Sequence, residues 1–111
     1  MYNEILSALR ATEYPFAEVA WRNAPAGDYG TFAVDSAYDA LWTDNHIRSQ
    51  TLEGAVHLFT KTPGPGPVHA VQAALDTLEI SWYLSSNQFE EDTGYIHWEW
   101  IVSWTEVPEY G

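Results

Sequence analysis

The chain has 111 residues, of which 46% are hydrophobic, and its sixteen acidic and four basic side chains give a formal net charge of −12. This composition predicts one folded domain over residues 1–111 with a hydrophobic core, and the absence of cysteine excludes disulfides, thiol catalysis and cysteine-ligated zinc. So acidic a chain cannot neutralise phosphates, which excludes nucleic-acid binding as its main activity. No apolar run approaches the roughly 18–20 residues of a membrane span, and the first residues lack the features of a signal peptide, so we expect a cytosolic protein.

The first half of the chain predicts one helix and three strands. Asn3 can cap a helix over residues 3–12, which ends before a proline because the preceding residue avoids the helical conformation. The segment 41–50 is mostly polar and is expected to form an exposed loop between two strands. Alternating apolar residues predict strands over residues 17–23, 31–38 and 51–61.

The second half predicts a helix and two strands. Pro67 suits the first turn of a helix over residues 67–78, which carries an apolar stripe. The period then drops to two from Ile80, and again from Ile96 to Trp104. The order of elements predicts an α+β fold with two helices on one face of a mainly antiparallel sheet of about five strands. The covered face of that sheet is expected to contain Phe32, Val34, Val56, Leu58, Trp82, Leu84, Trp98 and Trp100.

The triplet Asp92-Thr93-Gly94 matches the one that carries the catalytic aspartate of aspartic proteases. Too little chain follows Asp92 for a protease core, and the adjacent Glu90 and Glu91 would repel a shared carboxylate pair. A glycine after two turn-forming residues is instead typical of a three-residue hairpin loop. We therefore predict that Asp92 lies in a turn and has no catalytic role.

Two histidines are candidates for a metal site. His57 and His97 lie on the polar side of their predicted strands, near Glu53 and Glu99, and adjacent strands can bring them together. A metal site needs at least three converging ligands, and neither histidine has the close ligand spacing that signals one. The sequence also lacks a Gly-X-Ser-X-Gly elbow and a phosphate-binding loop. We therefore expect no enzymatic activity, no cofactor and no bound metal.

The start of the polar segment is the best candidate for a contact surface. Trp42 is an aromatic residue at the edge of a polar stretch, and an exposed aromatic more often marks an interface than a catalytic group. A simple long turn is the alternative, but Arg48 could pair with an acid across an interface. The predicted interface residues are Trp42, Thr43, Asp44, Asn45, His46, Ile47 and Arg48.

The arrangement of elements resembles the tail terminator, or tail completion, proteins of long-tailed bacteriophages. After the first helix, "AEVAWRNAPAGDYGTFAVD" places a proline-bearing loop before an apolar strand, and "LWTDN" leads to "EGAVHLFTK". A helix ending in "AALDTLEISW" and an acidic hairpin, "FEEDTGYIHWEWIVSW", complete the likeness. The likeness covers about residues 3–105 and consists of element order and aromatic positions, without a catalytic signature.

This resemblance implies a structural protein of the virion tail or neck, assembled in the host cytoplasm. Such proteins form a ring, typically a homohexamer, that caps the tail tube and joins it to the head connector or stopper protein. The implied partners are other copies of the chain, the major tail tube protein and the connector, with DNA passing through the ring. Six copies with a charge of −12 each would carry −72, so we expect an acidic channel without specific DNA binding.

Two alternatives remain open from the sequence. Other neck proteins are related in role, but stoppers are small barrels and adaptors are mainly helical, so two helices around five strands favour the terminator. The alternative from another class is an acidic DNA mimic that inhibits a DNA-binding protein. A mimic would spread its acids over one surface, whereas Glu90, Glu91 and Asp92 form a cluster here.

Overall fold

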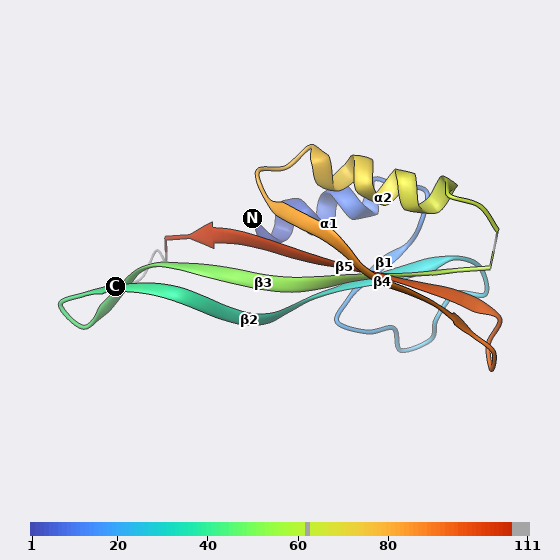
Figure 1. Ribbon diagram of the computed structural model, residues 1–111, viewed down its shortest axis with the longest axis horizontal. Helices are drawn as coiled ribbons and strands as arrows, with labels where there is room; N and C mark the ends of the chain where they lie inside the picture. Colours follow the sequence, from blue (N-terminus) through green and yellow to red (C-terminus); the bar gives the residue numbers. More distant parts are fainter. Residues whose placement is uncertain (62, 108–111) are drawn as a thin grey trace.

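The computed structural model describes residues 1–61 and 63–107 and contains seven regular elements (Figure 1). Their order confirms the prediction of a helix, three strands, a helix and two strands. The elements are α1 (Tyr2–Arg10), β1 (Phe16–Glu18), β2 (Tyr29–Thr43), β3 (His46–Thr60), α2 (Gly66–Asp76), β4 (Ser81–Glu90) and β5 (Tyr95–Glu106).

The five strands form one sheet in the order β1-β2-β3-β5-β4. The pair β1–β2 is parallel and the other three pairs are antiparallel, so the predicted α+β class is confirmed. Both helices lie on the same face of the sheet (Figure 1). Neither α1 nor α2 has the length and apolar character that a helix needs to span a membrane.

The hydrophobic core lies between the helices and this sheet face. Both helices bury the residues of their apolar stripes, and Trp100 is fully buried with its indole N–H donated to Gln72 Oε1 at 3.1 Å. Val34 and Leu84, which were predicted to be buried, are instead 40% and 41% exposed. Trp82 and Trp98 pack against the core but are only partly buried. The fully buried residues of the core are Ile5, Leu9, Phe32, Val56, Leu58, Val71, Leu75, Trp100 and Val102.

Gly30 allows the first strand to pack closely on the sheet. A Cβ atom at this position would lie 2.2 Å from the ring of Phe16 and 2.6 Å from the carbonyl oxygen of His57. Phe16 is buried, and its ring occupies the space that a side chain at position 30 would need. Glycine is therefore required here for packing, because a larger residue would displace Phe16 from the core.

The strand predicted over residues 17–23 is wrong beyond Glu18. Val19 has a positive φ of 65°, and the N–H of Ala20 is donated to the carbonyl oxygen of Glu18 at 2.7 Å, which closes a tight turn. The chain then runs beneath the sheet, on the face opposite the helices, until β2 begins (Figure 1). The alternation of Val19 and Trp21 suggested a strand, but the backbone turns at Val19 and so ends the strand before Trp21.

The exposed loop predicted over residues 41–50 is also wrong, because β2 and β3 continue through it. Thr43 pairs with His46, so the connection is a two-residue turn. Its residues Asp44 and Asn45 have φ values of 52° and 65°, the conformation of a type I′ hairpin turn. Aspartate and asparagine tolerate this left-handed region better than other residues with a β-carbon. The hairpin β2–β3 is therefore longer than the sequence pattern indicated.

Irregular pairing changes which side chains of β2 face the helices. Val34 pairs with Gly54 but Ser36 pairs with Glu53, so β2 has one extra residue at Asp35. This β-bulge places Tyr38 opposite Thr51, on the face away from the helices. Tyr38 therefore does not share a face with Phe32 and Val34, although simple alternation along the strand would place it there, since a one-residue bulge reverses the alternation.

The turn at Asp92 is confirmed. The backbone N–H groups of Thr93 and Gly94 are both donated to the carbonyl oxygen of Glu90, and Gly94 has a φ of 77°. Glu90 pairs with Tyr95, so the connection has four residues instead of the predicted three.

The two helices begin slightly earlier than predicted. Helix α1 begins at Tyr2, one residue before the predicted cap Asn3, and α2 begins at Gly66, one residue before Pro67.

Candidate functional site: the arm of the long hairpin

The outer half of the β2–β3 hairpin projects from the body of the molecule (Figure 1). Strand β5 pairs with β3 from Thr60 only as far as Gln50, and β1 pairs with β2 only over residues 30–32. Residues 39–50, which we call the arm, therefore form an almost isolated two-stranded ribbon within the described part of the chain. The arm accounts for the elongated shape of the molecule, which measures 52 × 26 × 22 Å.

The arm is built from local signals. The Asp44-Asn45 turn fixes its tip, and two further irregularities in pairing flank Leu41. Asp39, with a φ of 53°, lies in the first of these, where β2 again has one extra residue. Bulges of this kind increase the local twist of the ribbon. The arm is thus a twisted ribbon with a defined tip.

Large apolar side chains on the arm are exposed. Every residue from Val34 to His46 is exposed, and the exposed fractions of Leu41 and Trp42 are 59% and 60%. An isolated two-stranded hairpin is only marginally stable in water, because it buries little apolar surface against the entropy of ordering the chain. Exposed aromatic residues on such a ribbon are typical of an interaction site.

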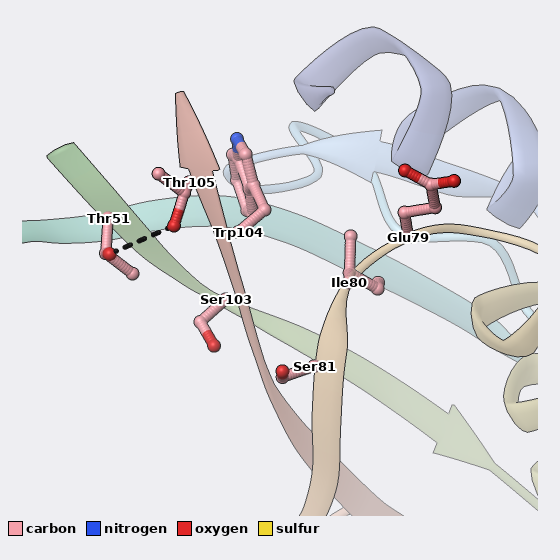
Figure 2. A pocket seen from close by; sticks show the side chains of 7 residues that line it. All are labelled: Thr51, Glu79, Ile80, Ser81, Ser103, Trp104 and Thr105. Atoms are coloured by element: carbon pink, nitrogen blue, oxygen red, sulfur yellow. Dashed lines mark hydrogen bonds between the residues drawn. The ribbon is translucent and has the colours of Figure 1, made fainter. Parts of the chain in front are cut away.

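A notch lies at the base of the arm (Figure 2). It has a volume of about 500 Å³, and its walls combine the hydroxyls of the sheet with Glu79 and apolar groups. Strand β4 begins at Ser81, opposite Ser103, so β4 does not pair with the last three residues of β5. The notch occupies this end of the sheet, where β5 continues past β4. Its lining residues are Thr51, Glu79, Ile80, Ser81, Ser103, Trp104 and Thr105.

The two histidines on the opposite face of the sheet are in direct contact. His57 Nδ1 and His97 Nε2 are hydrogen-bonded at 2.7 Å. The outer nitrogen of each ring faces a carboxylate at 3.5 Å, Glu99 for His57 and Glu90 for His97. Burial lowers the pKa of His57 and the nearby His97 lowers it further, whereas Glu99 and Asp35 act in the opposite direction. Within residues 1–61 and 63–107 no group of three potential ligands could hold a metal ion.

The structure places all seven predicted interface residues together at the tip of the arm. They belong to strand ends and a tight turn, not to the flexible loop that their polarity suggested. Trp42 is exposed as predicted, and Ile47 pairs with it across the hairpin. Two features were missed: the notch, which depends on where β4 begins, and the direct bond between His57 and His97. The sequence signal for the hydrogen bond between His57 and His97 was that both histidines lie on the polar side of their predicted strands.

The chain matches no protein-family model, and no curated protein sequence is similar to it. The arm, the notch and the histidine pair are therefore interpreted from their own geometry.

Proposed function

We propose that the chain is a structural subunit that assembles with copies of itself into a ring, as the tail terminators of long-tailed bacteriophages do. In this proposal the ring caps the tail tube, joins it to the head connector and lets DNA pass through. The observation that carries the proposal is the arm, which projects from the body and exposes Leu41 and Trp42. The α+β fold, with two helices and one five-stranded sheet, also supports the proposal, because it is the fold that the resemblance implies.

The arm has the properties of a segment that becomes stable on a partner. Along β2, the edge away from β3 is unpaired past Phe32 in the described residues, so its N–H and C=O groups can add to another sheet. Leu41 and Trp42 would contribute apolar area on the same partner. An isolated hairpin gains too little to offset the conformational entropy that is lost when its chain is ordered. On a partner, backbone pairing and apolar burial together would offset this loss.

The notch of a neighbouring copy has the chemistry to receive the arm. Ile80 can contact apolar side chains, and Glu79 can pair with Arg48, an exposed base near the tip of the arm. Arg48 has a specific role in this arrangement, because both surfaces otherwise belong to a strongly acidic chain. An opposite charge at the contact offsets part of the repulsion between copies and fixes the register of docking.

The charge of the chain suits a ring through which DNA passes. A hexamer of subunits with charge −12 would repel duplex DNA near the channel wall, within about 8 Å at physiological salt. We therefore propose that DNA passes through without specific binding. Filter binding at low salt tests this part: the assembled ring should not retain duplex DNA, and retention would contradict the proposal.

The main experiment is native mass spectrometry of the chain, alone and mixed with the major tail tube protein of the same phage. We expect rings, in solution or on the tube end, and their loss in the double variant Leu41→Ser, Trp42→Ala. Phe89→Ala is the matched control, because Phe89 is equally exposed at 65% but lies on β4, away from the arm.

The outcomes are distinct. If the parent chain stayed monomeric and formed no complex with the tube protein, the ring proposal would be wrong. If the double variant still formed rings, the proposal of a ring would stand, but the arm would not be the contact between subunits. Salt-sensitive binding to a basic DNA-binding protein, by a monomeric chain, would favour the DNA-mimic alternative instead.

A further inference from the structure

The sheet face opposite the helices carries a row of four ionisable groups from three strands. The row runs from Glu99 to His57, then to His97 and finally to Glu90, with separations of 3.5, 2.7 and 3.5 Å. Each of the three gaps joins a nitrogen to a hydrogen-bond acceptor and so needs one N–H group. The number of protons on the two rings therefore decides whether the row is satisfied.

One added proton satisfies the row, and a second one breaks it. Two neutral imidazoles have two N–H groups, which leaves one gap unfilled, whereas the singly protonated pair has three. A doubly protonated pair would place two N–H groups and two positive charges against each other across the 2.7 Å gap between His57 and His97. Like charges at this separation repel strongly, so the two rings would have to move apart.

Residues 19–28, which we call the flap, run past this pair and place apolar side chains beside it, while the side chains of His57 and His97 are 28% and 26% exposed. A cleft of about 330 Å³ lies between the flap and the sheet, and both histidines line it. The flap contributes Val19, Ala20, Trp21 and Ala24 to the cleft and no ionisable side chain. The charged groups that face the pair come from the strands: Glu90 from β4, Glu99 from β5 and Asp35 from β2. A second positive charge would thus meet an apolar wall as long as the flap is closed.

The flap is held by few contacts and begins at a strained residue. Trp21 Nε1 donates to the carbonyl oxygen of Gly30 at 2.8 Å, and the Tyr95 hydroxyl is within 3.2 Å of two flap carbonyls. Asp28 accepts the backbone N–H of Lys61 at 2.8 Å. Val19 is β-branched, and its positive φ in a three-residue turn is a strained conformation.

We propose that His57 and His97 form a proton-operated latch, which keeps the flap closed until a second proton separates the two rings. The open flap hydrates both rings and exposes the aromatic surface of Trp21, Tyr29 and Phe59. The singly protonated pair is already satisfied while the flap is closed, so it is the second proton that the open state binds more readily. Lowering the pH far enough to add that proton therefore favours opening.

The test follows Trp21 by ¹⁹F NMR of the full chain labelled with 5-fluorotryptophan, with Trp21→Phe to assign its resonance. The solvent isotope shift of this resonance reports how exposed the ring is. We expect Trp21 to become exposed as the pH falls below about 6.5, the ordinary histidine value. If the closed state binds the second proton about ten times more weakly than the open state, binding of that proton changes the open-to-closed ratio about tenfold.

Variants separate the latch from general acid unfolding. His57→Gln and His97→Gln should each remove the pH-dependent exposure of Trp21, whereas His69→Gln, at an exposed position on α2, should behave like the parent. The resonances of Trp100 and Trp104 in the helix-facing core should stay unchanged while Trp21 becomes exposed.

Three results would overturn the latch. A Trp21 resonance that does not change with pH in the parent chain excludes it without reference to any variant. Exposure of Trp21 together with Trp100 would show global unfolding in acid. A response that appears only with added Zn²⁺ and vanishes with EDTA would assign the histidines to a metal site and not to a proton latch.

Discussion

The two halves of the β2–β3 hairpin are both antiparallel ribbons but have opposite surroundings. In the body, Phe32, Val56 and Leu58 are fully buried between the sheet and the helices. In the arm, the same two strands continue with Leu41 and Trp42 more than half exposed. A strand is therefore not an element with a fixed stability here, because its contribution depends on whether another layer covers it.

Truncating the core should have the largest effect on the body. Trp100→Ala removes a fully buried indole and the hydrogen bond to Gln72, so it should lower the free energy of unfolding by about 3–5 kcal/mol. Denaturant melts followed by circular dichroism measure this change. Trp98→Ala should cost less, because Trp98 is only partly buried. Equal costs for the two variants would contradict the assignment of Trp100 as the centre of the core.

Gly30→Ala tests the close packing of β1 on the body. The new Cβ would overlap the Phe16 ring and the His57 carbonyl group, so we expect a loss of about 1–3 kcal/mol in the same melts. Gly27→Ala is the matched control, since a Cβ at this position has nothing within 4 Å. If both variants matched the parent, Phe16 would not be packed across Gly30.

The sequence predicted the body much better than the arm. Apolar side chains in the body repeat with the period of the element that carries them, as Val68, Val71 and Leu75 do in α2. Along β2 the alternation is interrupted by bulges at Asp35, before the arm, and at Asp39, within it, and the polar residues of the arm then resemble those of a loop. The candidate interface residues were found because an exposed tryptophan is unusual in itself, whatever element carries it.

Two features of the opposite sheet face depended on tertiary structure. The contact between His57 and His97 requires the register of β3 with β5, which no local pattern fixes. The flap requires a positive φ at Val19, a conformation that sequence alone disfavours for a β-branched residue. Sequence reasoning thus located the histidines on one face and expected adjacent strands to bring them together, but it did not predict their direct hydrogen bond or the flap beside them.

Trp42→Ala should separate stability from assembly. Because Trp42 is 60% exposed and lies outside the core, we expect the free energy of unfolding of the monomer to change by less than about 0.5 kcal/mol. Assembly with other copies, followed by native mass spectrometry, should be weakened much more. A loss of monomer stability comparable to that of Trp100→Ala would remove the distinction between arm and body.

The most local effect is expected at the tip of the arm, with Asn45→Gly. Asn45 has a φ of 65° in a type I′ turn, where an Asp-Gly pair is among the most favourable sequences, so glycine should stabilise the turn by about 0.5 kcal/mol. The arm contributes little to the core, and its hydrogen bonds should therefore open locally and not through global unfolding. Hydrogen exchange at the amides that join Thr43 and His46 should slow about twofold, while the denaturant midpoint stays unchanged. Asn45→Ala should accelerate the same exchange, because its β-carbon resists positive φ. If either change shifted the global midpoint instead, the arm would unfold together with the body, and the two halves of the hairpin would form one cooperative unit.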